Sequence, residues 1–165
     1  NFLRSHDVDC QQYLSPVEPC TACISPGDYY CGWCLRRKPG DGPDGECVRV
    51  DECTDADIEL KTCPVVQSIW PTSGSTAGGT LVTITGAGFD RTNTTCQFTS
   101  TITNETIDVK PISVDQFGQR ALCETPSVGT EGDFTLTVTR GLQYRLPTAQ
   151  TINFYSTQII FASTP

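Results

Sequence analysis

Residues 20–34 read CTACISPGDYYCGWC, so two Cys-x-x-Cys pairs stand only seven residues apart. Eight of the ten cysteines in this 165-residue chain fall within residues 1–63. About 60 residues bury too small a fraction of their surface to be stable through a hydrophobic core alone, so cross-links are expected here. An even number of cysteines at this density is typical of a disulfide framework formed in an oxidising compartment. We therefore predict a disulfide-rich domain and an extracellular location.

Two other kinds of cysteine chemistry compete with four disulfides. Zinc sites of paired cysteines usually separate the pairs by about 12–20 residues, and four further cysteines would be unexplained. Thiol–disulfide catalysis at Cys31-Gly32-Trp33-Cys34 needs a thiolate at a helix N-terminus. Pro39-Gly40 follows that motif too soon for such a helix to form. The residues favour disulfides over zinc or thiol catalysis.

The charge balance excludes some classes of partner. Charged residues make up 18% of the chain and the net charge is −8, whereas proteins that bind nucleic acid need a basic surface. The same balance argues against docking on an anionic membrane, and no run approaches the ~18 apolar residues of a spanning helix. We expect no nucleic acid and no direct membrane insertion by this segment. Because the chain begins at Asn1 and contains no methionine, we expect it to be part of a longer protein.

Composition changes at Cys63-Pro64, which predicts two domains with a short joint. Residues 1–63 carry 6 Lys/Arg and 12 Asp/Glu, a balance of −6, and residues 64–165 carry 5 and 7, a balance of −2. In the first part, the turn-rich stretch 39–46 predicts a hairpin between residues 34–36 and 47–50. Residues 51–60, with acidic residues early, predict one or two helical turns.

The second part alternates apolar and polar residues with a period of two, which is typical of half-buried strands. We predict strands at residues 65–70, 80–85, 95–98, 106–112, 121–124, 134–139 and around 151–155. The predicted core residues of these strands are Val82, Ile84, Phe134, Leu136 and Val138. Frequent turns between short strands indicate a β-sandwich. We expect Cys96 and Cys123 to form a disulfide between neighbouring strands; the alternative is two free buried thiols.

The eight-cysteine segment resembles a PSI (plexin–semaphorin–integrin) domain over residues 10–63, with Cys-x-x-Cys at 20–23, CGWC at 31–34 and three spaced cysteines after it. Sequence alone leaves 105 pairings of eight cysteines. The resemblance implies the pairs Cys10–Cys31, Cys20–Cys63, Cys23–Cys47 and Cys34–Cys53. Trp33 matches the family's tryptophan, which we expect to form a small core against the disulfides. The 12 residues between Cys34 and Cys47 exceed the spacing common in plexin-type members.

A second resemblance lies in residues 71–89, PTSGSTAGGTLVTITGAGF, and in Cys123-Glu124-Thr125-Pro126. It is similar to an IPT/TIG domain, an immunoglobulin-like sandwich, over about residues 64–157. Gly78-Gly79 leads into a strand, so it permits a turn and does not form a phosphate-binding loop. The predicted fold is thus mainly β: a lead-in (1–9), a small cysteine-knot-like PSI domain (10–63), the sandwich (64–157) and a linker or strand (158–165).

Few residues suggest catalysis or metal binding. His6 is the only histidine and lies in the lead-in, so nucleophilic catalysis lacks a positioned base. The densest acidic cluster is Asp51, Glu52, Asp55, Asp57 and Glu59. An exposed helix face explains this cluster better than a calcium site, because the EF-hand spacing is absent. We predict no enzyme, metal or cofactor, and we expect residues 36–38 to lie in a solvated loop.

The two sequons Asn93-Thr94-Thr95 and Asn104-Glu105-Thr106 predict N-glycans. The two resemblances imply a stalk, as in plexin-like or hepatocyte-growth-factor-receptor-like surface proteins, that positions neighbouring domains for ligand binding or adhesion. Its expected partners are proteins. The alternative is a subunit of an extracellular filament, in which the apolar residues 158–163 add a strand to a neighbour. A dimerising domain of a transcription factor is disfavoured by the acidic charge and the disulfides.

Overall fold

The computed structural model describes residues 9–13, 18–26, 30–38, 44–141 and 144–156. The chain forms two compact units. The first comprises residues 1–64 together with residues 140–145, and the second comprises residues 65–139 and 146–165. Sequence ranges alone assign residues 140–145 to the second domain, whereas their contacts place them in the first unit.

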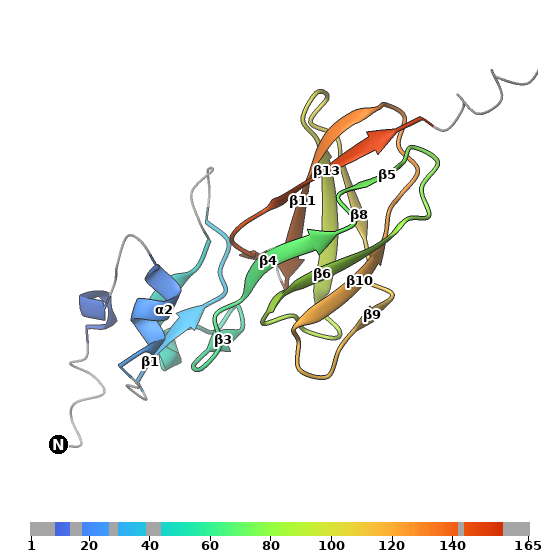
Figure 1. The fold of residues 1–165 in the computed structure, drawn as a ribbon. Helices are drawn as coiled ribbons and strands as arrows, with labels where there is room; N and C mark the ends of the chain where they lie inside the picture. Colours follow the sequence, from blue (N-terminus) through green and yellow to red (C-terminus); the bar gives the residue numbers. More distant parts are fainter. Residues whose placement is uncertain (1–8, 14–17, 27–29, 39–43, 142–143, 157–165) are drawn as a thin grey trace, which may run out of the picture. The chain divides into compact units, whose positions relative to one another are not determined.

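The first unit is built from short elements around one small sheet (Figure 1). They are η1 (Cys10–Tyr13), α2 (Pro19–Ile24), β1 (Cys31–Cys34), β2 (Glu46–Arg49), η2 (Val50–Glu52) and β3 (Ile58–Glu59). The strand order is β2-β1-β3 and both pairings are antiparallel. All four residues of the central strand β1 are buried, so the CGWC motif forms the middle of this unit.

Helix α2 is held by covalent bonds more than by its own sequence. Six residues are too few for a stable isolated helix. Pro19 occupies the first turn, where its missing N–H is not needed. Cys20 and Cys23 lie three positions apart, so they share a face of the helix, and both form disulfides.

A hairpin forms across the predicted turn, and β1 pairs with β2 in a register that places Trp33 opposite Cys47. Its first strand lies at Cys31–Cys34 and not at residues 34–36 as predicted. Residues 39–43 of its tip lie outside the described residues, as do the lead-in residues 1–8 and the predicted linker 158–165. The helical turns predicted within 51–60 are wrong except for η2. Ile58 and Glu59 form β3 against Cys34 and Trp33, so strand pairing outweighs the local helix preference.

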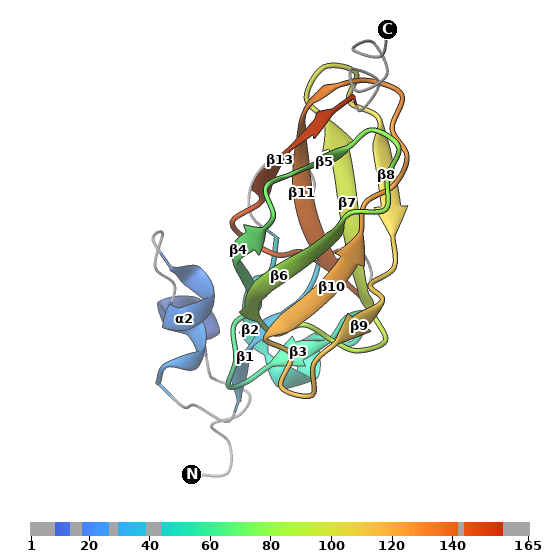
Figure 2. The same ribbon diagram turned by 45° about the vertical axis from the view of Figure 1, so that its right-hand side comes forward.

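The second unit is a β-sandwich of two sheets. Its strands are β4 (Val65–Trp70), β5 (Ser73–Ser75), β6 (Leu81–Ala87), β7 (Thr94–Ser100), β8 (Thr106–Val109), β9 (Ser113–Val114), β10 (Arg120–Glu124), β11 (Gly132–Arg140) and β13 (Gln150–Tyr155). One sheet has the order β4-β6-β10-β9 and the other β5-β13-β11-β7-β8. The short strand β12 (Tyr144–Arg145) belongs to the first unit. Figure 2 shows β6, β10 and β9 side by side, and likewise β11, β7 and β8. The predicted mainly β, immunoglobulin-like fold is confirmed.

Besides β3, three short strands were not expected from the sequence: β5, β9 and β12. The first is formed where the chain crosses between sheets, because β4 pairs with β6 whereas β5 pairs in parallel with β13. The crossing contains the cis bond Trp70-Pro71. Gly78 and Gly79 follow with φ of 83° and 88°, a backbone region that favours glycine.

The inner faces of the two sheets form the core of the second unit. The predicted residues Val82, Ile84, Phe134, Leu136 and Val138 are all buried there. The Phe154 ring packs edge-on against Phe134, with centroids 4.8 Å apart, and against Phe98 at 6.2 Å. Such edge-to-face pairs add about 0.5–1.5 kcal/mol beyond their buried area.

The disulfide Cys96–Cys123 joins β7 to β10. The expected disulfide forms, but these strands belong to different sheets, so it does not join neighbouring strands of one sheet. Both cysteines are fully buried, because alternation points both side chains into the space between the sheets. The bond therefore links the two layers of the sandwich.

Candidate functional site: the disulfide-linked unit and residues 140–145

Four disulfides connect the elements of the first unit. They join Cys10 to Cys31, Cys20 to Cys63, Cys23 to Cys47 and Cys34 to Cys53. These are the pairs that the PSI-like spacing implies, and no cysteine is free. Cys31 and Cys34 at the two ends of β1 form separate bonds, so this CxxC motif is not a redox pair in the structure.

Trp33 lies at the centre of the unit. It is 4% exposed, and its indole Nε1 donates a hydrogen bond to the hydroxyl of Tyr144, 3.1 Å away. Gly45, with φ of 101°, lies so close that a Cβ there would overlap the indole ring. Burial raises the pKa of Tyr144 above its ordinary value, outweighing the opposing effect of the bond from Trp33. The tyrosine is therefore a neutral acceptor at pH 7.

A buried ion pair joins Asp44 to Arg145. The Asp44 side chain is fully buried. It accepts hydrogen bonds from Arg145 Nη2 at 2.7 Å, Nε at 3.0 Å and the backbone N–H at 2.8 Å. The backbone N–H of Lys38 adds a fourth bond at 3.0 Å. Burial opposes ionisation of Asp44, but these bonds together outweigh it and hold the pKa of the carboxyl below its ordinary value.

A second arginine of residues 140–145 makes a similar contact. Arg140 Nη1 donates to Glu59 Oε2 at 2.5 Å, and Nη2 lies 3.7 Å from Asp57 Oδ2. The Arg140 side chain is only 11% exposed and that of Glu59 is 20% exposed, so this pair is shielded from water. Two arginines and one tyrosine of this short segment are thus bound within the first unit.

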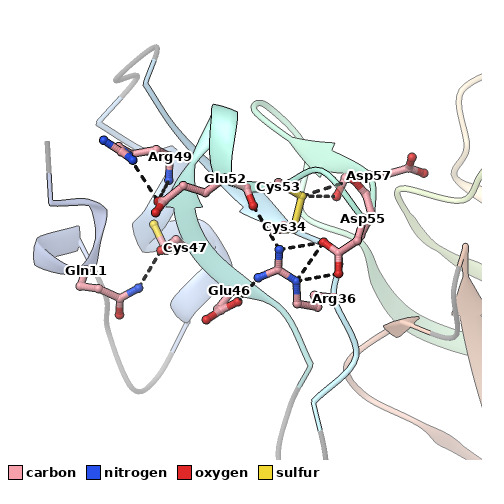
Figure 3. Close-up of polar contacts among 11 residues, drawn as sticks. Gln11, Cys34, Arg36, Glu46, Cys47, Arg49, Glu52, Cys53, Asp55 and Asp57 are labelled. Atoms are coloured by element: carbon pink, nitrogen blue, oxygen red, sulfur yellow. Dashed lines mark hydrogen bonds and ion pairs between the residues drawn. A yellow bond between two sulfur atoms is a disulfide. The ribbon is translucent and has the colours of Figure 1, made fainter. Parts of the chain in front are cut away.

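Arg36 forms a separate, more exposed cluster (Figure 3). Its guanidinium donates to Asp55 through Nε and Nη2, to Glu46 through Nη1 and to the carbonyl of Glu52. The hydrogen bond from Arg36 lowers the pKa of Asp55, and the bonds to Asp55 and Glu46 raise the pKa of Arg36. Both pKa shifts favour the charged forms of Arg36 and Asp55, as a stable ion pair requires. Arg36 lies in the predicted loop, where Arg37 and Lys38 are exposed, but its own side chain is fixed by these ion pairs.

The acidic cluster predicted as an exposed helix face is instead distributed over several arginines. Asp55 pairs with Arg36, and Asp57 and Glu59 pair with Arg140. Asp51 and Glu52 both lie close to Arg49 (Figure 3 shows the Glu52 contact). Four of the five acids are exposed, as predicted, and only Glu59 is half-buried. The predicted helix is wrong, because only η2 is helical.

The described residues offer little for catalysis. Among them, no three His, Cys, Asp or Glu side chains are grouped as a metal would require; His6 lies outside them. A hollow lined in part by Ser100, Glu105 and Phe134 holds about 60 Å³, well below the ~300 Å³ of small ligand pockets. None of the helices in the described part is long and apolar enough to cross a membrane.

Sequence reasoning named Trp33 and the cysteines of this site but missed four residues: Asp44, Arg140, Tyr144 and Arg145. Asp44-Gly45 had been interpreted only as a turn. The other three are about 100 positions away in the sequence, and no local pattern connects positions so far apart. The only sequence signal was that Asp44, a polar residue, flanks a predicted strand of the hairpin. The two sequon residues Asn93 and Asn104 lie exposed in the second unit.

Comparisons with known proteins include a family match to the part of the chain that forms the sandwich. The family model described as IPT/TIG domain matches residues 64–157. A structure of the plexin A4 full extracellular region, domains 1 to 8, has a TM-score of 0.47 and 18% identity over 90% of this chain. This chain spans only 16% of that one. The TIG domain from human nuclear factor of activated T-cells, cytoplasmic 4, has a TM-score of 0.46 and 15% identity, covering 58% of this chain and 90% of that domain.

A second structure of the plexin A4 extracellular region, domains 1 to 10, has a TM-score of 0.44 and 18% identity, covering 90% of this chain and 13% of that one. The family match accounts for more than half of the 165 residues. The match covers the strands of the sandwich, and the PSI-like cysteine segment at residues 10–63 precedes it. This chain therefore belongs to the IPT/TIG domain family.

Proposed function

We propose that the chain is a non-enzymatic, extracellular PSI–IPT module that acts as a stiff spacer in a larger surface or secreted protein. It would position neighbouring domains for ligand binding or adhesion, and its partners would be proteins. The observation that carries this proposal is the buried Asp44–Arg145 pair within the first unit. It fastens a segment that is covalently continuous at both ends with the second unit.

Chain connectivity supports stiffness. The backbone passes between the units at residues 64–65, 139–140 and 145–146. A single short linker leaves several free dihedrals, whereas three covalent passages leave far fewer independent motions. The segment between the last two passages carries the contacts of Arg140, Tyr144 and Arg145. These contacts hold the segment within the first unit, so relative motion of the units is left to backbone rotation at the three passages.

Disulfide content supports the extracellular location. Five disulfides persist only in oxidising compartments in most organisms. The four disulfides of the small first unit restrict its unfolded chain, and each contributes about 2–4 kcal/mol to the free energy of unfolding. A spacer under load outside the cell benefits from this, because cross-linked loops cannot be pulled out.

The experiment is a comparison of residual dipolar couplings from the two units in the oxidised, ¹⁵N-labelled chain. A stiff spacer gives one alignment tensor for both units. Tyr144→Phe, which removes the acceptor of the Trp33 indole bond, should make the two tensors diverge; Tyr155→Phe, at an exposed position, should not. Tensors that already differ in the wild type, as free bending through tens of degrees would produce, would refute the spacer.

The filament alternative depends on residues 158–165 and is tested on oxidised chain secreted from a eukaryotic host, which keeps any glycans. Sedimentation velocity of this chain should show a monomer. If the chain instead self-associates and Phe161→Lys disperses it, a filament subunit joined by strand addition replaces the spacer as the better account.

A further inference from the structure

Asn93 and Asn104 lie at the two ends of β7 in the second unit. Both are exposed. Asn93 ends a turn in which Asp90 Oδ1 accepts hydrogen bonds from the backbone N–H groups of Thr92 and Asn93. The seven residues of β7 separate this turn from the next one by about 23 Å, at the usual ~3.3 Å per residue.

Asn104 occupies the turn from β7 to β8. Its φ is 61°, a conformation that asparagine tolerates better than most residues. The backbone N–H donates to the carbonyl of Ser100, 3.0 Å away, which holds the turn while the side chain faces water. The sequon hydroxyl, on Thr106, is also exposed and lies 3.0 Å from the hydroxyl of Thr99.

These two turns border a sheet edge, because among the residues that the structure describes β8 ends its sheet and pairs only with β7. The N–H of Ser100 bonds to the carbonyl of Glu105. The antiparallel pattern then directs the backbone groups of Thr106 and Asp108 away from β7. Ile102, in the turn beside Asn104, is 69% exposed. The unpaired backbone groups of such an edge strand can pair with a strand of another chain unless another group covers them.

We propose that N-linked glycans are attached at Asn93 and Asn104 and that they cover the free edge of β8 against strand addition. The proposal rests on the extracellular location proposed above. Attachment joins the side-chain amide nitrogen to the anomeric carbon of an activated, lipid-carried oligosaccharide. The carrier diphosphate leaves with the electron pair of the broken C–O bond, and the amide loses one proton to a base.

The sites are tested by intact mass of the full chain secreted from a eukaryotic host, before and after peptide N-glycosidase treatment. Because glutamine would be strained at the φ of Asn104, the sequons are removed at Thr95→Val and Thr106→Val. Thr95→Ser and Thr106→Ser keep a hydroxyl and are the matched controls. The wild type and both serine variants should lose the mass of two glycans, and each valine variant that of one.

The outcomes separate this proposal from the proposed function. Secreted, fully disulfide-bonded protein whose mass does not change on treatment overturns the glycan sites and leaves the spacer standing. Protein that is retained in the cell with free thiols overturns the extracellular location itself.

The shielding role is tested by sedimentation of the double variant Thr95→Val/Thr106→Val. It should self-associate at a concentration at least tenfold lower than the glycosylated wild type does. Adding Asp108→Pro, which removes an outward N–H from the edge without removing a bond to β7, should restore the monomer. A glycan-free variant that stays monomeric, or one that proline does not rescue, overturns the shielding role.

Discussion

Replacing Arg145 with methionine tests the buried ion pair most sharply. Arg145→Met keeps the aliphatic stem but removes the charge and the side-chain donors that Asp44 accepts. Two backbone N–H bonds, from Lys38 and from residue 145 itself, remain on the carboxylate. The variant therefore leaves a fully buried carboxylate only half-satisfied.

The magnitude follows from this geometry. Breaking a buried pair by removing one partner costs about 3–5 kcal/mol. Arg145 is 24% exposed, and the two backbone bonds remain, so we expect the free energy of unfolding to fall by about 2–3 kcal/mol at pH 7. With an m value of about 2 kcal/mol/M, the urea midpoint of the first unit should drop by about 1–1.5 M.

The loss of stability in Arg145→Met should depend on pH. In the wild type the folded-state pKa of Asp44 is depressed. Its stabilisation is complete above the unfolded pKa of about 3.9 and is lost as pH falls through the lower folded value. In Arg145→Met the side-chain bonds that offset the burial of Asp44 are gone, so the pKa of the carboxyl rises. As pH falls, Asp44 is therefore protonated in the variant before it is in the wild type, which removes the cost of the buried charge. The stability difference should therefore narrow as pH falls from 7 towards 4.

The assay is urea unfolding of the oxidised chain followed by tryptophan fluorescence. Trp33 is 4% exposed and Trp70 is 76% exposed, so the change in signal comes mainly from the first unit. Arg36→Met is the control, because its pairs with Glu46 and Asp55 are more exposed, and its effect should be clearly smaller. Equal midpoints for Arg145→Met and the wild type, or a difference independent of pH, would refute the reasoning.

Two further substitutions address the same unit. Tyr144→Phe leaves the buried indole N–H of Trp33 without its acceptor and should cost about 1–3 kcal/mol in urea unfolding, whereas the exposed Tyr155→Phe should cost almost nothing. Gly45→Ala forces a Cβ against the Trp33 ring at a positive φ and should cost at least ~1 kcal/mol in thermal unfolding. Gly129→Ala, with open space around it, should be nearly neutral; comparable losses in both glycine variants would contradict the close contact.

Much of the second unit could be predicted, because alternation is a local signal. The strand predicted at 65–70 agrees with β4, and Val82 and Ile84 point inward as their spacing indicates. The strands that were missed are short: Ser73–Ser75 has no apolar alternation, and its pairing with β13 depends on residues 80 positions away. The sheet membership of Cys96 and Cys123 likewise depends on topology, which alternation does not encode.

The first unit was less predictable for a physical reason. Disulfides hold α2 and pairing with β1 holds β3, so their conformations do not have to follow local propensity. The spacing of the cysteines and the turn residues of the hairpin carried most of the information. Asp44 shows the limit most clearly. Its Asp-Gly context is typical of a turn, but the side chain is buried by Arg145, which lies 101 positions later. A single sequence contains no signal for such a pair.

Hydrogen–deuterium exchange of the Arg145 amide tests most directly whether residues 140–145 belong to the first unit. That N–H is bonded to Asp44, and the amide of Leu35 is bonded to Asp57 in the same unit. In Gly45→Ala, both amides should exchange faster together, while the Thr125 amide, bonded to Thr80 in the second unit, keeps its wild-type rate. An Arg145 amide that follows Thr125 and ignores the substitution would contradict the account.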